Sequence, residues 1–108
     1  MKRADEFKDF KIAPRYTGEI PKILLYLARL GDGDLDQNIM KDLGLGEKQC
    51  GAGMHYLLGI GAVDWHTEFY EEGGGKAFRM RRTITDRGLE KLRSYGTVAP
   101  TTLELPSS

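Results

Sequence analysis

The sequence has one cysteine, no long hydrophobic run and no excess of either charge. Cys50 has no second cysteine with which to form an internal disulfide, which is typical of proteins from a reducing compartment. The longest apolar run, residues 23–28, is far shorter than the roughly 20 residues that cross a bilayer. The first residues are charged rather than apolar, unlike a signal peptide. We therefore expect a cytoplasmic protein without a membrane segment.

Residues that would form a catalytic or metal site are also lacking. There is no paired carboxylate motif, no Ser–His or Cys–His signature and no cluster of metal ligands. Cys50 and His55 are five residues apart, off the spacing that places two side chains on one helix face. The three glycines at 73–75 precede no helix, so they do not predict a phosphate-binding loop. We expect no enzymatic activity, no metal and no cofactor.

The distribution of charge along the chain is uneven. The 108 residues carry 16 basic and 16 acidic side chains, so the net charge lacks the basic excess of many nucleic-acid-binding proteins. Residues 18–72 carry four basic and ten acidic side chains, whereas residues 76–95 carry seven basic and two acidic ones. This asymmetry predicts one side of the surface that attracts anions. The alternative is an ordinary solvated face.

Helical periodicity occupies the first half of the chain. Between residues 20 and 30, apolar residues recur every three or four positions, with Pro21 suited to the first turn and Gly31 ending the helix. A short second helix is expected to begin at Asp34, as N-cap, with Gln37 as its capping-box partner, and to stop at Gly44. A third is expected from about residue 47 to residue 60. Its expected inward positions are Cys50, Met54, Leu57 and Ile60.

The period then changes to two, which predicts strands. Residues 63–70 and 77–84 form the expected hairpin, joined by a glycine-rich loop. Trp65 and Phe69 share the parity of Val63, so we expect them to lie in a core beneath the hairpin. Arg82 interrupts the apolar parity of the return strand, which we expect to reflect a bend or bulge.

A closing helix and two chain ends complete the expected organisation. The closing helix begins at Thr85 or Asp86 and ends near Gly96. Residues 1–17 are expected as an N-terminal arm, residues 18–96 as the domain, and residues 97–108 as a flexible tail. Phe7 and Phe10 are spaced for one helical turn within the arm.

These elements resemble the winged helix-turn-helix family, and in particular regulators of the MarR and PadR types. The resemblance is carried by Ile39 and the turn Leu43-Gly44-Leu45, by the apolar positions of the third helix, and by the exit Ile60-Gly61-Ala62-Val63. Residues 82–89 resemble the junction of the family between the hairpin and the closing helix. The resemblance covers roughly residues 20–95. It implies an α+β winged helix-turn-helix fold: a three-helix core, a two-stranded wing and a closing C-terminal helix.

The resemblance also implies binding to double-stranded DNA, with the third helix in the major groove. Gln49 is suited to reading adenine, and Lys48 to reaching guanine or phosphate. The function implied is that of a small transcriptional regulator or a viral or plasmid accessory protein. The candidate DNA-binding residues are Lys48, Gln49, Ala52, His55, Tyr56, Lys76, Arg79 and Arg81.

An alternative is a winged helix that binds a protein partner and not DNA, and the neutral net charge favours it. The partner would dock on the acidic surface of residues 18–72 or on the glycine-lined face of the third helix. Glu71 and Glu72 lie at the tip of the expected wing, where a basic residue would suit DNA better. Glycines at 51, 53 and 59 weaken the third helix, which indicates either a closely approaching surface or a lightly constrained one. A homodimer is compatible with both hypotheses, and the candidate pairing surfaces are the arm containing Phe7 and Phe10 and the closing helix.

Overall fold

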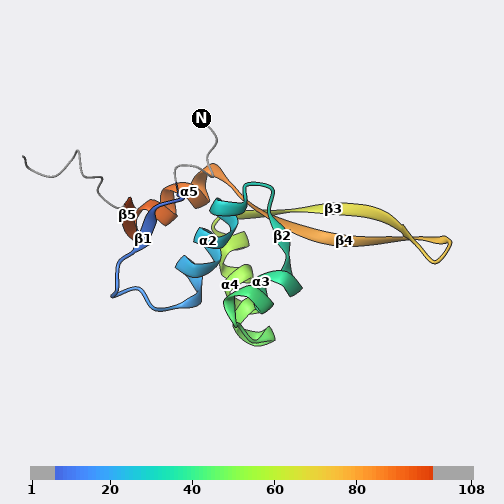
Figure 1. Cartoon of the computed structure of the whole chain (residues 1–108), viewed down its shortest axis with the longest axis horizontal. Coiled ribbons are helices and arrows are strands. Elements are labelled where there is room, and N and C mark those ends of the chain that lie inside the picture. Colours follow the sequence, from blue (N-terminus) through green and yellow to red (C-terminus); the bar gives the residue numbers. More distant parts are fainter. Residues whose placement is uncertain (1–6, 99–108) are drawn as a thin grey trace, which may run out of the picture.

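Four helices and two small antiparallel sheets make up the described part of the chain, which in this computed structural model comprises residues 7–98 (Figure 1). The fold is α+β, as expected. In chain order the elements are β1 (Phe10–Ile12), α2 (Glu19–Leu30), β2 (Asp34–Leu35), α3 (Asp36–Leu43), α4 (Glu47–Gly59), β3 (Val63–Glu72), β4 (Gly75–Ile84), α5 (Asp86–Arg93) and β5 (Gly96–Val98).

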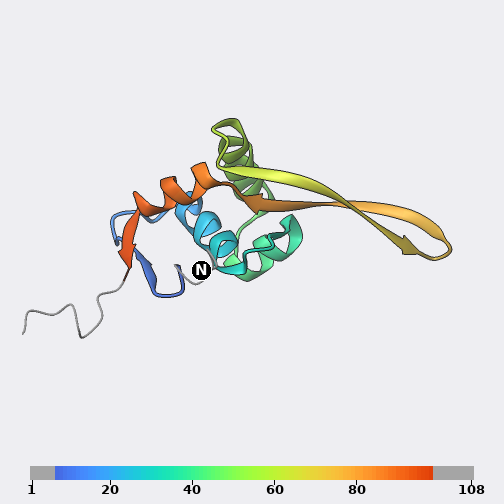
Figure 2. The same ribbon diagram turned by 90° about the horizontal axis from the view of Figure 1, so that it is seen from above.

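Helix α2 is the centre of the core. Its apolar stripe is buried as expected, with Ile23, Leu24 and Leu27 fully inaccessible to solvent. Pro21 lies in its first turn, and Gly31 ends it with a positive φ of 80° and an N–H that donates to the Leu27 carbonyl at 3.1 Å. Helices α3, α4 and α5 and strand β4 all contact α2. Figure 2 shows α2 between α5 and the α3–α4 pair.

The start of α3 differs from the expected capping box. Asp34 lies in β2, which pairs with β4, so α3 begins two residues later, at Asp36. The Asp34 carboxylate accepts from the Leu35 N–H and from the Asn38 side-chain amide, both at 2.8 Å, while Gln37 is exposed. Strand pairing therefore holds Asp34 extended and moves the helix start along the chain. Asp34 still stabilises this start, but through Asn38.

The expected hairpin is present, and its register is continuous. Val63 pairs with Ile84 at the base and Glu72 with Gly75 at the tip, where Gly73 and Gly74 adopt φ values of 60° and 81°. The full sheet has the order β2-β4-β3. No bulge interrupts β4 at Arg82, which pairs directly with Trp65, so the expectation of a bulge is wrong.

The expected burial of Trp65 and Phe69 is also wrong. Trp65 is 48% exposed and Phe69 is 73% exposed, as is much of Phe78 on the facing strand at 65%. The reason is length: strands of ten residues span about 33 Å, and only their base, near Val63, lies over the helices. In Figure 1 the rest of the hairpin projects away from the helical body.

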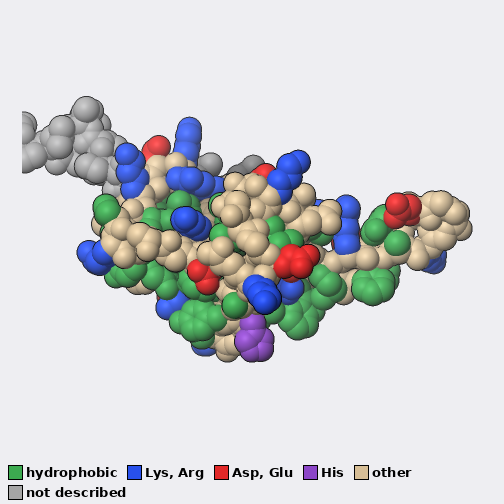
Figure 3. All heavy atoms as spheres, turned by 90° about the horizontal axis from the view of Figure 1, so that it is seen from below, with side chains coloured by type: hydrophobic (Ala, Val, Ile, Leu, Met, Phe, Trp, Pro, Cys, Tyr) green, Lys and Arg blue, Asp and Glu red, His purple; other side chains and the backbone are tan. Residues whose placement is uncertain are grey.

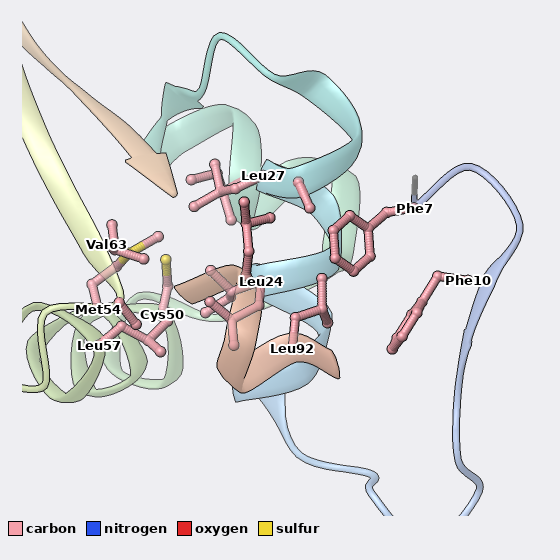
Figure 4. Packing of buried hydrophobic residues seen from close by; sticks show 14 residues of the cluster. Phe7, Phe10, Leu24, Leu27, Cys50, Met54, Leu57, Val63 and Leu92 are labelled. Atoms are coloured by element: carbon pink, nitrogen blue, oxygen red, sulfur yellow. The ribbon is translucent and has the colours of Figure 1, made fainter. Parts of the chain in front are cut away.

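The described ends of the chain contribute to the core. Phe7 and Phe10, expected in a separate arm, are buried and pack edge to face, with ring centroids 5.2 Å apart (Figure 4). The Arg29 guanidinium donates to both of their carbonyls at 3.1 Å. Strand β1 pairs with β5, so Phe10 faces Val98 and the chain closes on itself. Of the expected tail, residues 99–108 lie outside the described part.

The glycines of α4 have different surroundings. A methyl group at Gly53 would lie 3.0 Å from Ile23 Cδ1, so this glycine permits close packing of α4 against α2. Gly51 and Gly59 face open space. Helix α5 contains a tighter position: a methyl group at Gly88 would meet the Ala62 carbonyl oxygen at 2.1 Å. Gly88 therefore sets the approach of α5 to the end of α4.

We predict opposite effects of alanine at two helical glycines. Gly88→Ala should lower the free energy of unfolding by about 1–3 kcal/mol or more, because the methyl group has no room beside a backbone oxygen. Gly51→Ala, the matched control in open space, should raise it by about 0.5–1 kcal/mol through higher helix propensity. Urea denaturation followed by circular dichroism measures both. A neutral Gly88→Ala would contradict this packing of α5.

Candidate nucleic-acid interface

Helix α4 has one buried and one exposed face. Cys50, Met54 and Leu57 face the core, as expected, while Ile60 follows the helix and is partly buried. The exposed face carries every candidate residue assigned to this helix. These residues are Lys48, Gln49, Ala52, His55 and Tyr56.

The segment before α4 fixes how this face is presented. Helix α3 ends at Gly44, whose left-handed φ of 69° reverses the chain, and the Leu45 N–H then donates to the Met40 carbonyl at 2.9 Å. Leu45 is partly buried against the core. Helix α4 starts at Glu47, after only a three-residue turn. Two helices joined by a short turn therefore present the N-terminal half of α4 to solvent.

The hairpin arginines are engaged within the chain. Arg79 Nε donates to Glu68 Oε2 at 2.6 Å, and Arg81 lies 3.4 Å from the same oxygen. Arg81 also donates to the Gly33 carbonyl at 3.1 Å. The hydrogen bond from Arg79, followed by the charges of both arginines, lowers the pKa of Glu68. Two positive charges thus share one negative charge, and this cluster retains a net positive charge. Lys76, at the tip, is exposed opposite Glu71.

Arg82 has a structural role that accounts for its place among apolar residues. Its guanidinium donates to both carboxylate oxygens of Asp36, at 2.9 and 3.0 Å, and lies 5.7 Å from the centroid of the Trp65 ring. The bond to Asp36 raises the pKa of Arg82, although partial burial opposes this. The arginine therefore joins the hairpin to the first turn of α3.

Lys91 is a basic residue beside α4 that the sequence analysis did not assign to the interface. Its ammonium lies 5.7 Å from the Tyr56 ring centroid and 5.4 Å from that of Tyr95. Partial burial opposes the charged form, but hydrogen bonding to the Tyr56 hydroxyl and the interactions with Tyr95 outweigh it and raise the pKa of Lys91. The only sequence signal for this position was the basic excess of residues 76–95.

A polar cluster around Tyr26, in the C-terminal half of α2, was also not predicted. The Tyr26 hydroxyl lies 2.6 Å from carboxylate oxygens of both Asp34 and Asp42. Burial, and then the bonds to these two carboxylates, raise the pKa of Tyr26. Burial would raise the pKa of Asp34, but its hydrogen bonds from Tyr26, Asn38 and the Leu35 N–H lower it. The cluster ties α2 to β2 and α3.

Comparisons of the chain with protein-family models, curated proteins and solved structures gave no match. Among residues 7–98, no helix is long and apolar enough to cross a membrane. In the same residues, no three His, Cys, Asp or Glu side chains are grouped so that they could hold a metal ion. The assignment of function therefore rests on the geometry of the exposed surfaces.

Cys50 should react slowly with thiol reagents in the native protein. Its side chain is 2% exposed, and burial, together with the charge of Asp36, raises the pKa of the thiol above its ordinary value. Native protein mixed with an aromatic disulfide reagent at mildly alkaline pH should release thiolate far more slowly than urea-unfolded protein. Equal rates in the two states would contradict the burial and revive a redox role.

Proposed function

We propose that the chain binds double-stranded DNA as a winged helix-turn-helix, with α4 in the major groove. The observation that carries this proposal is the exposed face of α4, the second helix after a short turn, which concentrates five polar or small residues away from the core. A major groove about 12 Å wide admits one helix, and small residues such as Ala52 allow its backbone to approach the bases. The order α2, α3, α4 and hairpin supports the same assignment.

Side chains on this surface divide into two roles. Gln49 offers an amide that can bond two atoms of adenine, and Lys48 reaches guanine or phosphate. His55 and Tyr56 lie further along α4, where the sugar–phosphate backbone would pass. Lys91 adds a positive charge beside Tyr56. On the hairpin, Lys76 and the cluster formed by Arg79, Arg81 and Glu68 supply further positive charge.

A small transcriptional regulator, or an accessory protein of a virus or plasmid, is the role that we infer from this activity. Both roles need a compact domain that binds duplex DNA without catalysing a reaction. This chain is small, and α4 is the helix that would enter the major groove.

The salt dependence of DNA affinity tests the proposal. Wild-type protein should bind a generic duplex at about 50 mM salt, with log affinity falling linearly as log salt rises. Lys48→Ala and Lys91→Ala should each reduce the magnitude of that slope by roughly one if the lysine contacts a phosphate. Lys11→Ala removes the same charge from exposed β1, at the far end of the fold from α4, and should leave the slope unchanged (Figure 1).

Replacing Gln49 separates base reading from phosphate contact. Gln49→Ala should cost about 1–3 kcal/mol on a site selected from random duplexes and little on unselected DNA. Arg79→Ala with Arg81→Ala should weaken binding to all sequences alike, because phosphates carry no sequence information. Fluorescence anisotropy measures all variants. The absence of salt-dependent binding by the wild type at about 50 mM salt would contradict DNA binding.

One observation favours the alternative of a protein-binding domain. Glu68 partly neutralises Arg79 and Arg81, and the hairpin that bears them also exposes the aromatic side chains Trp65, Phe69 and Phe78. Large exposed apolar surfaces mark sites of protein association. If DNA binding fails the salt test, protein binding through the hairpin is the function that remains.

A further inference from the structure

Strand β3 is a long edge strand. Among residues 7–98, the order β2-β4-β3 gives it a neighbour on one side only, and all ten of its residues pair with β4 without interruption. Edge strands are commonly protected from pairing with another chain by charged side chains, above all lysine, and by proline, a bulge or short length. The sequence of β3, Val-Asp-Trp-His-Thr-Glu-Phe-Tyr-Glu-Glu, contains neither proline nor lysine, and its register has no bulge. Its charged residues are four carboxylates, and the Trp65 N–H on the outer edge donates to the Asp64 side chain at 2.9 Å. A further strand would replace that one bond and would find the rest of the outer edge unpaired among residues 7–98.

One hydrogen bond at the base of the hairpin shows which residues of β3 direct their N–H and C=O groups at β4 and which direct them outward. The Thr85 N–H donates to the Ala62 carbonyl at 3.0 Å, so the backbone of residue 62 points at the neighbouring strand. Because this direction alternates in an antiparallel pair, even-numbered residues of β3 bond to β4 and odd-numbered ones point outward. Trp65 fits this parity, since its N–H donates to the Asp64 side chain at 2.9 Å.

The face shared by the odd-numbered side chains of β3 is largely apolar beyond Arg82, whose guanidinium lies 5.7 Å from the Trp65 ring centroid. It carries Trp65 and Phe69 from β3, and Phe78 and Met80 from β4, which are the cross-strand partners of Phe69 and Thr67. The rings of Phe69 and Phe78 are 6.4 Å apart, and both are largely exposed. Figure 3 shows hydrophobic side chains standing along the projecting hairpin. We call these four side chains, three of which are aromatic, the aromatic strip.

We propose that two copies of the chain pair through β3, antiparallel and centred on Thr67, into one continuous sheet. In this register Thr67 faces Thr67 of the second copy, and Trp65 faces Phe69 of the second copy. All of the opposed odd-numbered residues then direct their N–H and C=O groups at each other. The aromatic strips of the two copies join on one face of the sheet, since opposed residues in an antiparallel pair share a face.

The charges on β3 select this register. On the opposite face, His66 lies against Glu68 of the second copy, and Asp64 lies against Tyr70. No like charges face each other between residues 63 and 71. Because the outward parity must be kept, the register can shift only by two residues at a time. A shift in one direction places Asp64 opposite Glu68 of the second copy. A shift in the other direction places Glu68 opposite Glu68 of the second copy. Both arrangements bring like charges together and are unfavourable.

This dimer is independent of DNA binding and differs from the pairing surfaces considered in the sequence analysis. Phe7 and Phe10 are buried within one chain, and α5 buries Leu89 and Leu92 in the same core. The hairpin, in contrast, offers both an open backbone edge and exposed apolar side chains. The partner that these features fit best is a strand with the same charge pattern, which the second copy supplies.

Cysteine cross-linking of the full chain tests the register. Thr67→Cys places two thiols on opposed residues with Cα atoms about 5.5 Å apart, within the range of a disulfide. Glu71→Cys is the matched control. Residue 71 is also exposed and its backbone also points outward, but in this register it lies about 27 Å along the strand from residue 71 of the second copy. With diamide as oxidant, Thr67→Cys should form a disulfide-linked dimer rapidly and Glu71→Cys should not. Cross-linking of both variants equally, or of neither, would overturn the proposal.

Analytical ultracentrifugation without DNA tests the association itself. The wild type should be a dimer within a concentration series reaching about 100 µM, and Thr67→Pro should weaken dimerisation about tenfold or more. The Thr67 N–H points outward, so proline removes a donor from the edge and none from the β3–β4 ladder. Thr67→Val keeps that donor and should still dimerise. A monomeric wild type, a larger assembly, or a dimer unaffected by Thr67→Pro would overturn the proposal in favour of another partner or interface.

Discussion

The burial of one face of α2 is the constraint on which the other elements depend. Ile23, Leu24 and Leu27 have no contact with solvent, and α3, α4, α5, β4 and the two N-terminal phenylalanines all pack around this helix. A small domain has little apolar surface to bury. Loss of the packing around α2 would therefore separate all of these elements at once. Gly53 and Gly88 permit the close approaches that complete the packing. This packing positions the exposed face of α4 relative to the base of the hairpin.

Polar bonds at the margin of this core set the direction of the projecting parts. Arg82 and Asp36 join β4 to α3, while Tyr26 joins α2 to Asp34 and Asp42. Such charge-assisted bonds are directional, whereas apolar packing is not. The bonds between Arg82 and Asp36 therefore help to set the angle at which the base of the hairpin leaves the body. In our proposals α4 reads DNA and the edge of β3 pairs two copies, so this angle would determine the spacing of the two reading helices.

Local patterns predicted most of the elements, and long-range contacts account for what they missed. The periodicities of α2, α4 and the hairpin identified Leu24, Leu57 and Val63 as core residues correctly. Parity alone could not show that Trp65 is exposed, because it defines a face but not whether anything covers that face. The shift of the α3 start depends on the pairing of Asp34 with β4, 48 residues away at Arg82. Likewise, the place of Lys91 beside Tyr56 depends on how α5 docks.

Mapping of backbone amides by NMR during titration with a duplex of about 20 base pairs tests the central claim, that α4 reads DNA through its exposed face. The account predicts that the largest shift changes occur at Lys48, Gln49, Ala52 and Tyr56, with smaller changes along β4 and at Lys91. Amides of β1 and β5, on the far side of the core, should remain unchanged. Changes confined to β1 and β5, or the absence of any change at saturating DNA, would contradict the account.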